Sequence, residues 1–304
     1  MASFSNEVKK ELVSVITDKD KRYACLYGIL LFCKNLSEER ISFTTESTEF
    51  YNMFLLLVKS VFKDKIKVNI EISEKKSGGN IYSINIDGSD NVKPVLDKYN
   101  IKPLNREINL RHIVNNSLSV FLAGVFFICG SISDPYKEYH LEFTIPNEML
   151  YNDLRSILLS IGINGRKTQR KGTNILYIKD SENIEDVLTF IGAQQSTIEL
   201  MNIKIYKDVR NKANRIANCD SANIDKVITA ASRQIKDIKF IMENNEFENL
   251  PAELREVSLL RLENPEMTLQ EIGELLAKPI GRSGITRRFQ KISKLAEEIK
   301  QKRS

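Results

Sequence analysis

The sequence has few of the features that would mark a membrane, secreted or zinc-binding protein. Its longest apolar run, residues 121–129, is far shorter than the roughly 18–20 residues needed to cross a bilayer. Its cysteines form no C-x-x-C pair, and neither histidine is spaced from them as zinc ligands are. The amino terminus, MASFSNEVKKEL, is polar and unlike a signal peptide. We therefore expect a cytoplasmic protein with reduced, mostly buried thiols and without a metal, a cofactor or a membrane partner.

Length and charge indicate two or three soluble domains and a basic carboxyl end. The chain has 304 residues, of which 42% are hydrophobic and 28% charged, and its formal net charge is +5. A small net positive charge does not by itself indicate a binding partner, so the distribution of basic residues along the chain is more informative. Only two acidic residues, Glu297 and Glu298, lie between residues 278 and 303. The basic residues of that segment are Lys278, Arg282, Arg287, Arg288, Lys291, Lys294, Lys300, Lys302 and Arg303.

One long internal repeat divides the first two thirds of the chain. ISFTTESTEFYNMFLLLVKS resembles LEFTIPNEMLYNDLRSILLS, which places Phe43 against Phe143 and Tyr51 against Tyr151. GGNIYSINIDG likewise resembles GTNILYIKDSE. A repeat of this length is too long for a solenoid unit and favours a duplicated domain.

Each copy has the same pattern of expected elements. An apolar helix (about 22–35, then 117–130) precedes a strand (41–45, then 139–145) and an amphipathic helix (about 49–62, then 148–161). A β-hairpin follows, turning around residues 75–79 in the first copy and 170–172 in the second, and then a further helix. The predicted fold class is α+β, with a duplicated αββαββα domain followed by an all-α domain.

The segment FLAGVFFICGSISDP, residues 121–135, resembles the core helix of the LAGLIDADG homing endonucleases. In those enzymes the acidic residue before the final glycine holds a catalytic divalent metal ion. Here Cys129 occupies that position, before Gly130. A neutral thiol is a poor ligand for Mg²⁺, and Asp134, the next acid, stands beside a proline in an expected turn. The resemblance implies a nuclease scaffold without its metal site.

The first copy shows the same substitution. Small residues Ala24 and Gly28 occupy the stretch that corresponds to Gly124, and aligning Gly28 with Gly124 places Cys33 near the first copy's metal position. A glycine on a helix allows a second backbone to approach closely. The resemblance implies that these two helices pack together between the halves.

The carboxyl-terminal third predicts a helix-turn-helix. A helix ends at Pro265, Thr268-Leu269-Gln270-Glu271 is a capping box that opens a short helix, and a third helix begins near Ser283. Leu269, Ile272 and Leu276 are expected to face an apolar stripe on the third helix, made of Ile285, Phe289, Ile292 and Leu295. The third helix is then the one that contacts DNA.

The face opposite that stripe is basic, and its residues are the candidate DNA contacts. Arginine and glutamine can bind purine edges in the major groove, while Ser283 and the helix amino terminus can bind phosphate. The alternative is a trihelical packing module with a solvated basic face. The candidates are Ser283, Thr286, Arg287, Arg288, Gln290, Lys291 and Lys294.

Two smaller polar regions are candidates for accessory DNA contacts. Arg166, Lys167, Arg170 and Lys171 lie in the second hairpin. Arg210 and Arg215 lie in a polar stretch, residues 209–226, that precedes an expected helix at about 221–243. The apolar residues of that helix are expected to pack: Ile224, Val227, Ile228, Ala231, Ile235 and Ile238. Each basic cluster is either a DNA contact or a solvated face.

From end to end the chain resembles the WhiA family. The resemblance is carried, in order, by SFSNEVKKEL, FLAGVFFICGSISDP, VRNKANRIANCDSANIDK and TLQEIGELL…GRSGITRRFQKI. The family's motif commonly has glycine where this chain has Cys129. The resemblance implies a non-enzymatic regulator that binds promoter DNA and acts in cell division, chromosome segregation and, where it occurs, sporulation. It also implies a nucleoid-associated protein, with double-stranded DNA and other transcription regulators as partners.

The expected domains are a duplicated LAGLIDADG-like domain (1–205, halves about 1–110 and 111–205), a helical linker (206–247) and a DNA-binding domain (248–304, with the helix-turn-helix at about 268–302). Two other functions stay open. The duplicated domain could be a docking platform for protein or a small ligand, which a pull-down with residues 1–205 would test. It could also be an active endonuclease, which a metal-dependent nicking assay would test.

Overall fold

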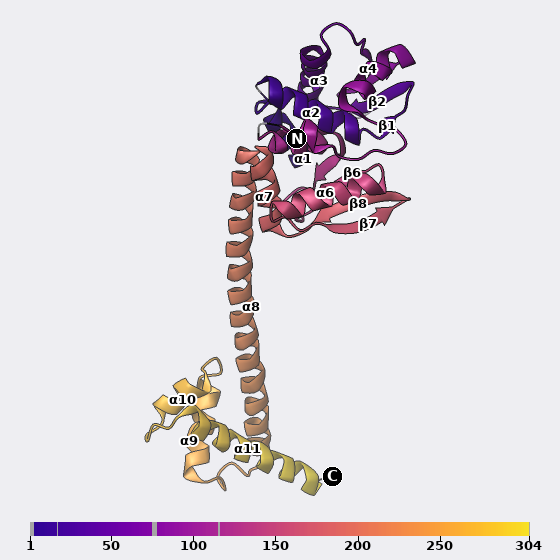
Figure 1. Ribbon diagram of the computed structural model, residues 1–304. Coiled ribbons are helices and arrows are strands. Elements are labelled where there is room, and N and C mark those ends of the chain that lie inside the picture. The colour runs from indigo at the N-terminus through magenta and orange to yellow at the C-terminus, as the bar shows by residue number, and fades with distance from the viewer. Residues whose placement is uncertain (1–2, 17, 75–77, 115, 304) are drawn as a thin grey trace. The chain divides into compact units, whose positions relative to one another are not determined.

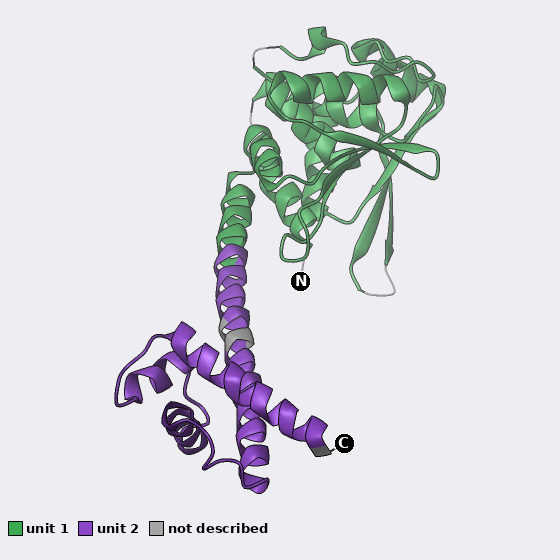
Figure 2. Ribbon diagram, turned by 90° about the horizontal axis from the view of Figure 1, so that it is seen from below, with its two compact units in different colours: residues 1–206 green, residues 207–304 purple. Residues whose placement is uncertain are grey.

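The structure is a computed structural model, and it describes residues 3–16, 18–74, 78–114 and 116–303 (Figure 1). Contacts divide the chain into two compact units, residues 1–206 and residues 207–304, which Figure 2 shows in different colours. Part of the turn predicted around residues 75–79, namely 75–77, lies outside the described residues. Within the described ranges no helix has both the length and the apolar character needed to cross a membrane.

The first unit contains two copies of one order of elements, αββαββα, as predicted. Helix α1 (Phe4–Val13) precedes the first copy, and the short helix η1 (Leu110–His112) lies between the copies. The first copy consists of α2 (Lys19–Phe32), β1 (Asn35–Leu36), β2 (Arg40–Thr45), α3 (Thr48–Phe62), β3 (Asn69–Glu74), β4 (Asn80–Asp87) and α4 (Ser89–Tyr99). The second consists of α5 (Leu118–Cys129), β5 (Gly130–Ile132), β6 (Leu141–Ile145), α6 (Glu148–Ser160), β7 (Arg166–Arg170), β8 (Thr173–Ile178) and α7 (Ser181–Ile191).

Each copy forms a four-stranded antiparallel sheet, and the two sheets have equivalent topology. The strand orders are β1-β2-β4-β3 and β5-β6-β8-β7. Phe43 of β2 lies opposite Ile84 of β4, and the equivalent Phe143 of β6 lies opposite Leu176 of β8. These residues point to the helices, because side chains alternate between the two faces of a strand. The duplication inferred from sequence is therefore confirmed.

The two copies meet where α2 and α5 pack together. A β-carbon built on Gly28 would lie 2.5 Å from the carbonyl oxygen of Phe121, and one built on Gly124 would lie 2.3 Å from that of Cys25. No larger residue fits at either position without moving a backbone, which confirms the close approach expected of these glycines. Around this contact lies a continuous apolar core that includes both helices and both sheets.

The second unit is helical. It contains the carboxyl-terminal part of α8 (Gln194–Glu243), and α9 (Ala252–Glu263), α10 (Leu269–Leu275) and α11 (Arg282–Arg303). Its core joins Ile238 and Ile241 of α8 to Leu254 of α9, Ile272 of α10 and Ile285 of α11. Figure 1 shows α9, α10 and α11 gathered at the last turns of α8. The end of α8, placed in a linker by the sequence pattern, is thus part of this core.

Helix α8 differs from the sequence prediction in two ways. It is continuous from Gln194, so it includes the polar stretch at residues 209–226 and begins well before the helix expected at about 221–243 and the helical linker expected from residue 206. The predicted packing stripe is wrong for Ile224 and Ile228, whose side chains are 58% and 55% exposed, although Ala231 and Ile238 are buried. Helical periodicity identifies one face of a helix, but it does not show how far along the helix the core extends.

Candidate nucleic-acid interface

The helix-turn-helix predicted from sequence is present, and its turn is fixed by two features. Thr268 and Glu271 form a reciprocal capping box: the Glu271 N–H donates to Thr268 Oγ1 at 3.3 Å, and the Thr268 N–H donates to Glu271 Oε2 at 2.7 Å. The hydrogen bond that the Glu271 carboxylate accepts from the Thr268 N–H lowers the pKa of that carboxyl. Gly273 allows the turn between α10 and α11 to pass close to α10, because a β-carbon at this position would lie 2.3 Å from the Ile280 carbonyl oxygen. The capping box predicted from sequence is confirmed.

Helix α11 has a buried face and an exposed polar ridge. Ile285, Phe289 and Ile292 are buried in the core, as the pattern predicted. The opposite face carries the candidate contacts that are exposed to solvent. These are Ser283, Arg287, Gln290, Lys291 and Lys294. At 100° per residue they lie within one sector of the helix, so a single surface could meet all five.

Two of the predicted contact residues lie on the flanks of this ridge. Arg288 has a side chain only 17% exposed, and its Nη2 lies 3.4 Å from Glu253 Oε2 of α9. Thr286 is half-buried, and its Oγ1 donates to the Arg282 carbonyl oxygen at 2.8 Å. Both residues are already engaged by protein groups, so they contribute less to the exposed surface than their charge and position suggested.

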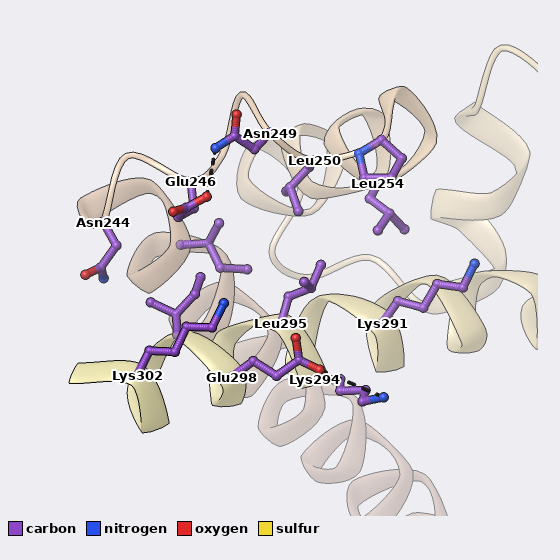
Figure 3. Close-up of a pocket in the computed structure, with 13 residues that line it drawn as sticks. Asn244, Glu246, Asn249, Leu250, Leu254, Lys291, Lys294, Leu295, Glu298 and Lys302 are labelled. Carbon is purple, nitrogen blue, oxygen red and sulfur yellow. Dashed lines mark hydrogen bonds and ion pairs between the residues drawn. The ribbon is translucent and has the colours of Figure 1, made fainter. Parts of the chain in front are cut away.

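A groove runs along one side of the ridge. Figure 3 shows Lys291 and Lys294 extending from α11 beside it, across from Leu250 and Leu254. Its volume is about 580 Å³. Lys294 Nζ lies 3.9 Å from Glu298 Oε1, one turn further along the helix. Such an exposed pair contributes little to stability, so Lys294 stays available for a phosphate.

The hairpin cluster of the first unit does not form one surface. Arg166 and Arg170 lie on the sheet face away from the core, opposite Tyr177 and Thr173 of β8. The side chain of Lys167, the next residue along the strand after Arg166, points to the opposite face. Lys167 lies opposite Leu176, on the face that the helices cover. Because side chains alternate along β7, the candidate cations of the hairpin do not share one face.

The surroundings of these cations differ accordingly. Lys167 is paired with Glu148 of α6, and its ammonium lies 4.7 Å from the centre of the Tyr151 ring. Arg170 Nη2 lies 3.4 Å from Glu142 Oε2 on the open face. Lys171 is in the turn, with a φ of 50°. Arg166 and Arg170 thus share the open face of the sheet, and Lys171 is exposed in the turn between β7 and β8.

Arg210 and Arg215, the remaining accessory candidates, are exposed on α8. Lys226 of α8 and Arg261 of α9 were not among the residues predicted from sequence, and they line a cavity with Arg282. No feature of the sequence distinguishes Arg261 from an exposed arginine on a helix. Its burial is seen only in the folded protein.

The two degenerate metal positions hold free thiols, with Cys33 buried and Cys129 half-buried. Cys33 Sγ donates to the carbonyl oxygen of Ser42 at 3.3 Å, and Cys129 Sγ donates to that of Val125 at 3.2 Å. Burial raises the pKa of the Cys33 thiol to about 11 and that of Cys129 further still, so both are neutral at physiological pH. Asp134 is in a turn, where its Oδ1 accepts from the Tyr136 N–H at 3.0 Å, as expected. Across the described residues, no group of three or more His, Cys, Asp or Glu side chains is placed to hold a metal ion.

Comparison with known proteins finds the same two parts. The family described as WhiA LAGLIDADG-like domain matches residues 118–210, and the family described as WhiA C-terminal HTH domain matches residues 213–296. The probable cell division protein WhiA of Clostridium tetani is 36% identical over 314 residues, covering 98% of each chain. That of Clostridium perfringens strain 13 is 36% identical over 311 residues, again covering 98% of each chain.

A solved structure extends the likeness to the fold of the chain. The crystal structure of full-length DUF199/WhiA from Thermotoga maritima matches with a TM-score of 0.58 and 29% sequence identity. The match covers 98% of this chain and 99% of that one. The chain therefore belongs to the WhiA family of cell division proteins, with a LAGLIDADG-like domain and a carboxyl-terminal helix-turn-helix domain.

Proposed function

We propose that this protein is a sequence-specific, double-stranded DNA-binding regulator of transcription. The observation that carries the proposal is the exposed ridge of α11, which follows a capped helix and a close turn and presents basic and amide side chains. A helix of this kind enters the major groove, where its side chains reach base edges. Promoter regions are the expected sites, and the nucleoid is the expected location.

The ridge divides into base readers and backbone contacts. Arg287 and Gln290 project from the amino-terminal half of α11, the part that enters the groove most deeply. Arginine binds guanine and glutamine binds adenine through paired hydrogen bonds. Lys291 and Lys294 follow later and meet phosphates, while Ser283 meets a phosphate at the helix amino terminus.

The cellular role is carried over from relatives named as probable cell division proteins. We place this chain in cell division through control of transcription, with chromosome segregation and, where it occurs, sporulation as related processes. Other transcription regulators are its expected protein partners. The proposed accessory backbone contacts are Arg166, Arg170, Lys171, Arg210 and Arg215, while Lys167, which faces the helices and pairs with Glu148, is a weaker candidate.

The LAGLIDADG-like domain is proposed to have lost nuclease activity. Metal-dependent phosphodiester hydrolysis needs hard oxygen ligands, and the two positions in question hold protonated thiols. Supercoiled plasmid should stay uncut in Mg²⁺ or Mn²⁺. Linear or nicked product that disappears with EDTA and in Cys129→Ala would contradict the proposal.

The binding function is tested by competition between a preferred promoter fragment and random duplex. Arg287→Ala should weaken binding to the preferred fragment by about 1–3 kcal/mol and change binding to random duplex little, because it removes a base contact. Lys294→Ala should weaken both alike. Equal effects of the two substitutions on both DNAs would show that Arg287 does not determine sequence preference.

A further inference from the structure

A second cavity of the carboxyl-terminal unit, distinct from the groove of Figure 3, is strongly positive. Its volume is about 410 Å³, and all four helices of the unit contribute to it. Lys226 comes from α8, Arg261 from α9 and Arg282 from the first turn of α11. Thr268 and Gln270 at the start of α10 add polar groups, and the described lining residues include no carboxylate.

Arg261 forms the buried part of this lining. Its side chain is 1% exposed, and its Nη1 donates to backbone carbonyl oxygens, among them that of Met267 at 2.6 Å. Its guanidinium carbon lies 5.6 Å from the centre of the Phe289 ring. Its Nε is buried and has no hydrogen-bond acceptor among the described groups. Its hydrogen-bond acceptors are neutral backbone carbonyls, the Glu266 carboxylate acts on it electrostatically without lining the cavity, and arginine does not lose its proton in proteins.

The two outer cations form no ion pair with the described residues. Lys226 is exposed on α8, Arg282 is exposed on α11, and neither forms an ion pair with any residue in the described part of the chain. The nearby carboxylate of Glu271 is already engaged by the Thr268 N–H. Three like charges facing one cavity repel one another, and an anion among them removes that repulsion.

The place of the cavity suggests which anion it takes. Arg282 is the first residue of α11 and directly precedes Ser283, so the cavity adjoins the amino-terminal end of the proposed reader helix. Peptide dipoles there favour negative charge. On a duplex bound by that helix, the groups beside this end are backbone phosphates.

We propose that this cavity binds one backbone phosphate of the DNA, held between Lys226 and Arg282 above the buried Arg261 guanidinium. The assignment rests on the proposed function and extends it, because it adds a phosphate contact shared by α8, α9 and α11 of the carboxyl-terminal unit. Arg261 contributes its positive charge from the buried side of the cavity, and its hydrogen bonds to backbone carbonyls hold the loop after α9 in place. The contact is independent of base sequence.

The test measures how the affinity of the full-length protein for random duplex DNA depends on salt. Releasing the counterions of one phosphate contributes about 0.9 to the slope of log K against log salt concentration. The double variant Lys226→Ala with Arg282→Ala should lower the steepness of the slope by about that amount. Lys239→Ala removes an exposed lysine of the same helix outside this cavity and should leave the slope unchanged. Equal slopes for wild type and the double variant would overturn the assignment.

Two further measurements distinguish a lost DNA contact from a loss of folding and from binding of a free anion. Circular dichroism must show that the double variant unfolds at the wild-type temperature, so that a change of slope reports binding. Inorganic phosphate at constant ionic strength should not stabilise wild type more than the double variant. If phosphate does so while the DNA slopes are equal, the cavity takes a free anion and the DNA assignment is wrong.

Failure of this inference and failure of the proposed function give different results. If Arg287→Ala abolishes sequence preference but the double variant keeps the wild-type slope, only the phosphate contact is refuted. If the wild-type protein shows no preference among sequences and Arg287→Ala changes nothing, the proposed function itself is refuted.

Discussion

Adding one methyl group at Gly124 should force apart the two helices at the centre of the first unit. The new β-carbon of Gly124→Ala would lie 2.3 Å from the Cys25 carbonyl oxygen and 3.2 Å from the Cys25 Cα. These are backbone atoms, so no side-chain rotation can relieve the clash. Helix α2 would have to move by roughly 1 Å, because a carbon and a carbonyl oxygen in ordinary contact are about 3.3 Å apart.

The expected cost follows from two opposing effects. Overpacking a close-packed core typically costs about 1–3 kcal/mol, and a clash against a backbone belongs near the upper end. Replacing glycine by alanine within a helix increases the free energy of unfolding by about 0.5–1 kcal/mol, which partly offsets this cost. We therefore expect a net loss of about 2 kcal/mol in the free energy of unfolding of the first unit.

Tyrosine fluorescence during urea unfolding measures this loss selectively. The chain has no tryptophan, and its 10 tyrosines all lie within residues 1–206. With a urea m value of about 2 kcal/mol per molar, the midpoint should fall by roughly 1 M. Gly281→Ala is the control, since nothing lies within 4 Å of its new methyl group and it belongs to the second unit. A midpoint for Gly124→Ala equal to or above that of wild type would refute the close contact of α2 and α5.

Three further perturbations have defined outcomes. Thr268→Ala should cost about 1 kcal/mol of stability by removing the cap of α10, and Thr268→Ser should restore most of it in thermal unfolding; equal melting of both variants would contradict this. Burial raises the pKa of the Cys33 thiol from its usual value of about 9 to about 11, so folding favours the neutral thiol. The contribution of this thiol to the free energy of unfolding is therefore complete at neutral pH and is lost as pH rises from about 9 to 11. Urea midpoints followed by circular dichroism should fall over that range, and less in Cys33→Ala. Arg166→Ala with Arg170→Ala should flatten the salt dependence of DNA binding, whereas Lys167→Ala should leave it unchanged, and the reverse result would contradict the assigned sheet faces.

Much of the fold could be predicted because the relevant physics is local. Period-two alternation, turn glycines and paired segments such as those at Phe43 and Phe143 indicated the duplicated sheets. Gly28 and Gly124, within apolar helices, indicated that another backbone could come close, and the resemblance to the LAGLIDADG proteins implied that these two helices pack together. Strands β1 and β5 are only two and three residues long, too short for alternation to show.

The candidate site was only partly predictable because partners distant in the sequence decide it. Helical geometry placed Arg287 and Gln290 outward, and the fold leaves them exposed. It could not show that Arg288 meets Glu253, 35 residues earlier. Nor could it show that Arg261 is buried beneath a positive cavity, since burial is a property of the assembled helices.

The most direct test of the central claim, that α11 determines where the protein binds, is a genome-wide crosslinking map in living cells. Wild-type protein should be enriched at discrete promoter regions that share a sequence. Arg287→Ala, expressed at the same level, should lose those peaks and crosslink diffusely, because its phosphate contacts remain while a base contact is gone. If Arg287→Ala occupies the same promoters with the same enrichment as wild type, α11 does not read the sequence through this residue and the central claim is contradicted.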